Sequence, residues 1–205
     1  SQADIAHVIA LAEAEIIPHQ SAAKLLKVLL SVKAFPSENF SFDPKLGDAY
    51  KNREHYIHHL APDVAGWLRT GRARREATNI AYQIAVRERF LLLTEALLSL
   101  ADALKEQAAL HRSTIMSDFT YLQHAQPTTL GHYLLSFAFP LLRDLDRIKS
   151  AWSRVNQFSG GIGSINGSRL PFKRERLSNL LGFEEPIKNT RDAMWQADMP
   201  IEIMS

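Results

Sequence analysis

The stretch that decides the fold is IAYQIAVRERFLLLTEALLSLADALKEQAALH, residues 80–111. It belongs to an interval that has no proline between Pro62 and Pro127 and no glycine between Gly71 and Gly131. The stretch is rich in Ala, Leu, Glu and Arg, which are strong helix formers, and its apolar residues recur at helical spacing. The pattern predicts one helix of about 35 residues, roughly 50 Å long. Its apolar stripe is broad enough to contact more than one partner.

A second long helix is predicted directly after the first, from TTLGHYLLSFAFPLLRDLDRIKSAWSRVNQ at residues 128–157. Pro140 within it predicts a kink, because proline removes a backbone donor and clashes with a carbonyl one turn earlier. No convincing strand and no internal repeat is visible, so the predicted class is all-α, built on long helices. Shorter helices are expected at residues 3–17, 20–33, 46–68 and 172–181, and from about residue 190 onward.

The composition is that of an ordinary globular protein, with 205 residues, 46% hydrophobic residues and a net charge of +2. This charge gives no reason to expect a nucleic-acid partner, and no apolar run is long enough to span a membrane. There is no cysteine and the eight histidines lack metal-binding spacing, so neither a metal nor another cofactor is predicted. We expect a cytoplasmic protein. The apolar end of the sequence, NTRDAMWQADMPIEIMS, has no helix stop signal, which predicts a longer polypeptide.

Four short segments combine polar side chains with breaks in the helical pattern. They are DPKLGDAYKNRE (43–54), LRTGRARRE (68–76), TYLQHAQP (120–127) and SGGIGSING (159–167). Each has an ordinary interpretation: a capped helix start, a solvated basic face, a turn in which Thr128 or Thr129 caps the next helix, and a loop without a P-loop pattern. Taken together they favour a site for a small, multiply carboxylated substrate, because a helix N-terminus ringed by arginines attracts carboxylate.

The order of TGRARRE, TYLQHAQP, GGIGSINGSRLPFKRE and NTRDAMWQAD resembles the argininosuccinate lyase family of the fumarase/aspartase superfamily. The corresponding family segments read approximately TGRSRND, THLQxAQP, GSGALAGxxxxxDRE and NSxDAxxxRD, and the match runs from about Asp43 to Glu202. The resemblance implies a long-helix central bundle at residues 70–205, truncated at its C-terminus, after a smaller helical region at residues 1–69. It also implies a homotetramer with active sites shared between subunits. The implied reaction is β-elimination from an N-substituted aspartate, argininosuccinate or a related compound, which releases fumarate.

The resemblance also implies roles for individual residues. The implied catalytic residues are Thr120 and Tyr121, and the implied substrate-binding residues are Asp48, Tyr50, Arg72, Arg74, Arg75 and Gln123. Tyr50 and Tyr121 stand where the family has histidine, and Arg75 stands where it has asparagine. A phenol is mainly a neutral donor at neutral pH, whereas imidazole exchanges protons there. These departures predict a reshaped pocket, and the family's serine-bearing mobile loop is expected beyond residue 205.

Two alternatives to a lyase remain open. The chain could be a non-catalytic or regulatory paralogue that keeps the helical bundle without the acid/base chemistry. It could also be an unrelated helical interaction protein whose motifs match by chance.

Overall fold

The computed structural model describes residues 1–36, 39–194 and 197–204. Its mostly helical secondary structure confirms the predicted all-α class, and the chain forms two compact units. Unit 1 comprises Ser1–Ala85 and Asn156–Ser205, and unit 2 comprises Val86–Val155. The division predicted between residues 69 and 70 stays a prediction. No helix of the described residues combines the length and the apolar character that a membrane crossing requires.

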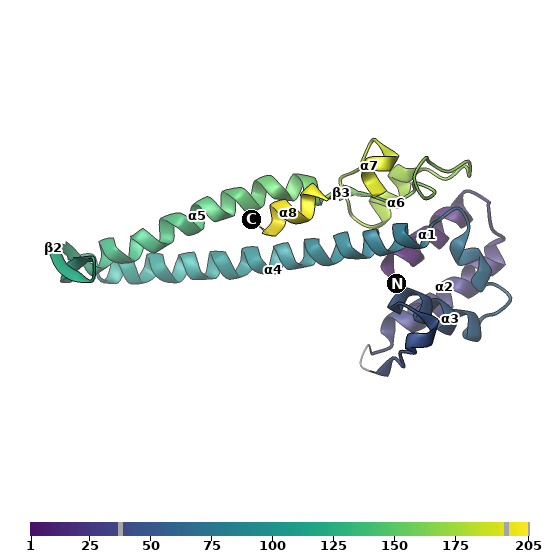
Figure 1. Ribbon diagram of the computed structural model, residues 1–205, viewed down its shortest axis with the longest axis horizontal. Coiled ribbons are helices and arrows are strands. Elements are labelled where there is room, and N and C mark those ends of the chain that lie inside the picture. The colour runs from purple at the N-terminus through teal and green to yellow at the C-terminus, as the bar shows by residue number, and fades with distance from the viewer. Residues whose placement is uncertain (37–38, 195–196, 205) are drawn as a thin grey trace. The chain divides into compact units, whose positions relative to one another are not determined.

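Unit 1 is built from short helices around the start of the long helix α4 (Figure 1). Its elements are α1 (Gln2–Glu13), α2 (His19–Ala34), η2 (Pro44–Leu46), α3 (Ala49–Leu60), η3 (Ala65–Arg69), the first part of α4 (Arg74–Leu110), β3 (Gln157–Phe158), α6 (Arg174–Leu180), β4 (Glu185–Pro186), α7 (Thr190–Met194) and α8 (Asp198–Met204). The single helix predicted at residues 46–68 is wrong. Pro62 follows the end of α3, and since proline cannot donate a backbone hydrogen bond, the chain turns before it resumes in η3. The helix expected from residue 190 includes Trp195 and Gln196, which lie outside the described residues.

Helix α1 is buried on two sides, which explains its nearly uniform apolar sequence. Val8 and Leu11 pack into a core with α2, α3 and η3. Ala3, Ala6 and Ala10 contact a second core. The first core contains Val8, Leu11, Ala12, Ile17, Ala22, Leu25, Leu29, Ile57, Ala61, Val64, Ala65 and Leu68, and the second adds Ile80, Phe158, Leu177 and Phe183 to the alanines of α1. The small alanines let α1 approach α4 and the later segments closely, and this packing positions the turn before α4.

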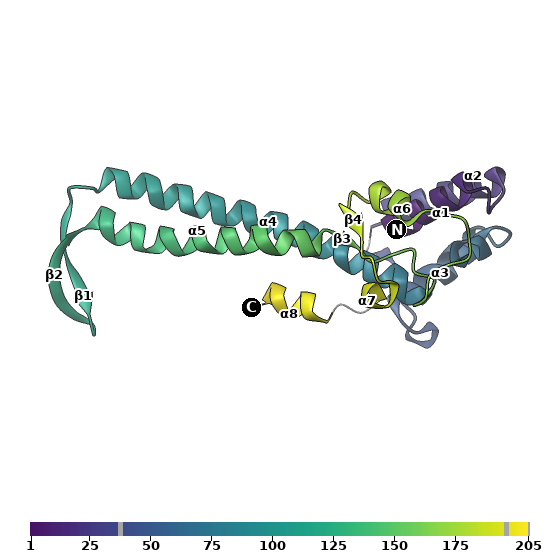
Figure 2. The same ribbon diagram turned by 90° about the horizontal axis from the view of Figure 1, so that it is seen from above.

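Unit 2 consists of the remainder of α4, a β-hairpin and α5 (Leu130–Val155). The two helices lie side by side in both views (Figures 1 and 2). At one end of the pair, the amide of Gly131 donates to the carbonyl of His111 at 3.1 Å. A β-carbon on Gly131 would lie 2.5 Å from the carbonyl oxygen of Ala108. Only glycine therefore permits this approach of the two helices.

The expectation of no strand is wrong for the hairpin. Strand β1 (Ile115–Thr120) pairs antiparallel with β2 (Gln123–Thr129), at the end of the helix pair shown in Figure 2. The hairpin escaped prediction because its loop, Tyr121-Leu122, lacks the Asn-Gly type of sequence that marks two-residue turns. The predicted cap of the following helix is confirmed, because the amide of His132 donates to Thr129 Oγ1 at 3.2 Å. Pro140 lies inside α5, and the predicted kink stays a prediction.

Candidate active site

The turn between η3 and α4 is held by contacts from both of its sides. Gly71 has φ +65°, a conformation that favours glycine, and a β-carbon there would lie 2.4 Å from Leu170 Cδ1. The carbonyl of Thr70 accepts a hydrogen bond from His7 Nε2 at 2.8 Å, and His7 is buried in α1. The imidazole contacts Phe172 edge-on at 6.0 Å between ring centroids. The backbone that leads into the arginines of α4 is therefore rigidly placed.

Arg72, the first predicted substrate ligand after this turn, pairs with a carboxylate inside unit 1. Its side chain is 1% exposed and forms an ion pair with Asp4 of α1, which also binds Arg53 of α3. Arg72 Nη1 donates to the carbonyl of Ala3 at 3.2 Å. Burial disfavours the charged form of Asp4, but the two guanidiniums outweigh it, so the pKa of this carboxyl lies below its usual range. Arg72 thus links the turn to α1 directly and to α3 through the Asp4–Arg53 ion pair.

Arg74 and Asp48, both predicted site residues, lie together at the surface of unit 1. Arg74 Nη1 lies 2.9 Å from Asp48 Oδ2, with about half of each side chain exposed. The other oxygen of Asp48 caps α3 by accepting the amide of Lys51 at 2.9 Å. A guanidinium carries five N–H groups. Asp48 therefore orients the Arg74 side chain and still leaves donors of the guanidinium for a ligand. Arg75 is exposed beside it, at the N-terminus of α4.

Tyr50, one of the two tyrosines at a family histidine position, is partly buried in the first turn of α3. The guanidinium of Arg53 stacks over its ring at 5.6 Å from the centroid. Burial raises the pKa of the Tyr50 hydroxyl above its ordinary value. At neutral pH this phenol is therefore protonated, and it can donate a hydrogen bond but not act as a base.

The glycine-rich loop binds an internal carboxylate. The amide of Gly161 donates to Glu76 Oε1 at 2.6 Å, and Glu76 is 1% exposed. Burial raises the pKa of Glu76 above its usual range, against the lowering effect of the loop amides. Arg174 also holds the loop in place, because its side chain donates a hydrogen bond to the carbonyl of Gly160 at 2.9 Å. The loop thus fixes the first turn of α4, a role that its weak sequence pattern did not reveal.

The segment TYLQHAQP lies in the hairpin of unit 2, and all of its side chains from Thr120 to Pro127 are exposed. Thr120 and Gln123 face each other across the loop as paired residues. Tyr121 and Leu122 between them have φ of 51° and 63° and are 98% and 95% exposed. The left-handed conformation is strained for bulky residues and collects at functional sites. The hairpin therefore presents two hydrogen-bonding side chains and a phenol on a strained, outward-facing tip.

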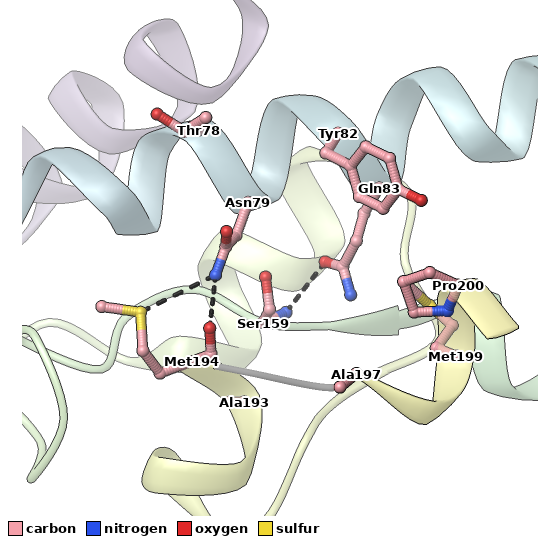
Figure 3. Close-up of a pocket in the computed structure, with 10 residues that line it drawn as sticks. All are labelled: Thr78, Asn79, Tyr82, Gln83, Ser159, Ala193, Met194, Ala197, Met199 and Pro200. Atoms are coloured by element: carbon pink, nitrogen blue, oxygen red, sulfur yellow. Dashed lines mark hydrogen bonds between the residues drawn. The ribbon is translucent and has the colours of Figure 1, made fainter.

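A cavity of about 330 Å³ lies beside α4 (Figure 3). Its first lining residues on that helix, Thr78 and Asn79, come about one turn after Arg75 in the sequence. Its lining was not predicted from the sequence, although residues 75, 79, 82 and 83 share one helix face by spacing. The residues that line it are Thr78, Asn79, Tyr82, Gln83, Ser159, Ala193, Met194, Ala197, Met199 and Pro200. Among the residues that the structure describes, no three metal-ligating side chains come together.

The buried His7 predicts a pH dependence of stability. Burial, followed by the nearby charge of Arg72, lowers the pKa of His7 to about 3, whereas an unfolded histidine titrates near 6.5. Between these values the unfolded state binds more protons, so the free energy of unfolding falls as the pH falls through this window. We expect a loss of about 2 kcal/mol between pH 7 and pH 5 from this residue alone.

Denaturant unfolding of the wild type and of His7→Gln at pH 5, 6 and 7 measures this effect. Glutamine can still donate to the carbonyl of Thr70 but does not titrate, so the variant should show a flatter dependence on pH. Equal slopes for the two proteins would contradict the assignment to His7.

Comparisons with known proteins identify the family to which this chain belongs. A family model described as Lyase matches residues 2–205. Argininosuccinate lyases of Methanothermobacter thermautotrophicus and Methanocaldococcus jannaschii are 34% and 36% identical over 98% of the chain, which spans 43% and 42% of their lengths. The structure of EDDS lyase in complex with formate is similar to this chain, with a TM-score of 0.88 and 31% identity over 98% of this chain and 40% of that chain. The same values hold for a variant of EDDS lyase with bound fumarate. The chain therefore belongs to the lyase family that this model describes.

Proposed function

We propose that the protein is a carbon–nitrogen lyase that removes the amine from an N-substituted aspartate by β-elimination and releases fumarate. The observation that carries the proposal is the start of α4, where Arg74 is oriented by Asp48 and stands beside the exposed Arg75. Two guanidiniums at a helix N-terminus form a binding site for the carboxylates of such a substrate. The names of the curated relatives, argininosuccinate lyases, support the same reaction.

The reaction requires stabilisation of negative charge. A base, which the family resemblance assigns to the serine of the mobile loop, takes a weakly acidic proton from the carbon next to a carboxylate. Charge builds up on that carboxylate until the C–N bond breaks. Arg74 and Arg75 would stabilise this charge as pre-placed donors. Thr120 and Gln123 would add hydroxyl and amide donors, and Tyr121 would protonate the leaving nitrogen or donate a hydrogen bond to it. Arg72 and Tyr50 would act indirectly, by supporting the turn and the helix start that carry Arg74 and Asp48.

We propose a homotetramer in which neighbouring copies share each active site. In unit 2, α4 exposes three consecutive leucines, Leu91, Leu92 and Leu93, each 49–59% exposed. Consecutive residues of a helix point about 100° apart, so no single neighbouring helix can cover all three. A bundle with several copies would cover them, and the outward-facing hairpin tip would then reach a site on another copy. The mass of the protein in solution tests this, since a stable monomer would contradict it.

Cytoplasmic location stays a prediction.

The direct test is incubation of the purified protein with argininosuccinate and with related N-substituted aspartates. Fumarate formation, followed by its ultraviolet absorbance, is expected with at least one of them. The absence of fumarate from every compound would favour the second candidate, a non-catalytic paralogue. That alternative is supported by the two tyrosines at family histidine positions, Tyr50 and Tyr121.

Tyr121→Phe tests the role of the phenol at the hairpin tip. We expect kcat to fall about 10²-fold with little change in KM, because a lost acid or donor acts on the reaction step rather than on substrate binding. Tyr133→Phe, which removes a hydroxyl from α5, serves as the matched control and should retain activity. Equal kcat values for Tyr121→Phe and the wild type would refute the catalytic role.

A further inference from the structure

We propose that the cavity along α4 binds the amine half of the substrate and selects an uncharged, mainly apolar group there. This inference rests on the proposed function, because it assigns the half of an N-substituted aspartate that the arginines do not bind. The cavity is formed by α4 on one side, by Ser159 on the glycine-rich loop, and by Ala193, Met194, Ala197, Met199 and Pro200 on the other side (Figure 3). Its volume of about 330 Å³ is at the lower end of the range for small-molecule sites.

The cavity begins one helical turn after Arg75, because Thr78 and Asn79 are the first residues of α4 that line it. Asn79 follows Arg75 by four residues, which is one turn, and places its side chain roughly 6 Å further along the helix axis. In an aspartate the carboxylate carbon and the amine nitrogen are roughly 2.5 Å apart, and the substituent begins one bond later. A substrate whose carboxylate is bound by Arg75 would therefore reach Asn79 and Gln83 with the substituent on its nitrogen.

The lining residues determine what can enter. None of the described residues that line the cavity carries a charge, and Ala193, Met194, Met199 and Pro200 supply apolar surface. A guanidinium or ammonium group would lose water there without gaining a carboxylate partner, which is costly. An alkyl or aromatic group would instead bury its surface favourably. The flexible methionine side chains can adapt to groups of different shape.

Two of the polar lining side chains already make hydrogen bonds within the protein, and the hydroxyl of a third has no partner in the described part of the chain. Asn79 Nδ2 donates a hydrogen bond to the carbonyl of Met194 at 2.6 Å, and Gln83 Oε1 accepts one from the amide of Ser159 at 3.2 Å. Both contacts are drawn in Figure 3. The Ser159 hydroxyl is buried and has no hydrogen-bond partner among the described residues. A buried hydroxyl without a partner is unfavourable, so a neutral ligand group such as an amide or hydroxyl could bind it.

Binding measurements separate this inference from the proposed function. Isothermal titration of the purified protein would compare N-benzyl-aspartate and N-cyclohexyl-aspartate with argininosuccinate, and a parallel fumarate assay would test catalysis. We expect the two apolar compounds to bind at least roughly tenfold more tightly than argininosuccinate. If they bind but no fumarate forms, the proposed reaction fails while the cavity assignment stands. Equal or tighter binding of argininosuccinate, or no binding of the apolar compounds, would overturn the assignment.

A variant at the rim provides the second test. Tyr82 is 47% exposed, so Tyr82→Glu adds a carboxylate beside the cavity with little risk to folding. The variant should shift the ratio of the two dissociation constants at least roughly tenfold toward argininosuccinate, because the cationic group then has a partner. Ser31→Glu adds the same charge to exposed helix α2 and should leave the ratio unchanged. An unchanged ratio in Tyr82→Glu would also overturn the assignment.

Discussion

Replacing Arg74 by alanine is expected to lower kcat/KM for fumarate release about 10³-fold. The side chain stands at the N-terminus of a 37-residue helix and is oriented by Asp48. Asp48 engages Nη1, and the remaining donors can bind a substrate carboxylate in a two-point arrangement that also meets the charge of the intermediate. Alanine removes every one of these donors. Because Arg74 is partly exposed, the fold should be unaffected, and steady-state kinetics on the best substrate of the panel measures the loss.

Two further variants make the result specific. Arg74→Lys keeps the charge but not the fork of donors, so it should recover only part of the activity. Arg176→Ala removes a different surface arginine, one that pairs with Glu13, and should leave kcat/KM unchanged. Wild-type kinetics in Arg74→Ala would refute the substrate-binding role of Arg74.

The largest expected effect on stability comes from Asp4→Ala, which should lower the free energy of unfolding by about 3–5 kcal/mol. The Asp4 side chain is 2% exposed and neutralises Arg72, which is 1% exposed. Without the carboxylate, the Arg72 guanidinium is left buried and unpaired. Denaturant unfolding at neutral pH measures the change.

The control for this variant is Glu13→Ala, which breaks an exposed pair with Arg176 and should change stability little. The double replacement of Asp4 by leucine and Arg72 by methionine should recover much of the lost stability, since two apolar side chains can replace a buried ion pair. A loss no larger for Asp4→Ala than for Glu13→Ala would contradict the importance of the buried cluster.

Much of the fold could be predicted because the signals are local. The absence of proline and glycine and the helical spacing around residues 80–111 predicted α4. Thr128 or Thr129 was expected to cap α5, and Thr129 does so. The hairpin could not be predicted, because Tyr121 and Leu122 adopt left-handed conformations that neither residue favours. Such a turn depends on the pairing of the strands on either side, which is not a property of the loop sequence.

The candidate site was predictable only in part. The motif pattern identified Arg74, Asp48 and the segment TYLQHAQP, and the structure places Arg74 in contact with Asp48. It did not identify Glu76 as the carboxylate that binds the glycine-rich loop, because its partner Gly161 is 85 residues away. It also missed Asn79 and Gln83. Their spacing from Arg75 marks one helix face, but only the packing of the later segments against that face makes a cavity.

By itself, the sequence determined the helical class, the long helices and the family, because helical hydrogen bonds join residues four apart and leave a period that can be read locally. Only the tertiary structure decided which charged groups pair with one another. Arg72 and Arg74 are two residues apart in the same motif, yet Arg72 pairs with Asp4, 68 residues earlier, and Arg74 pairs with Asp48 at the surface. The physical reason is desolvation. A buried guanidinium must find a carboxylate wherever the fold brings one, whereas an exposed guanidinium is stabilised by water and remains available to a ligand.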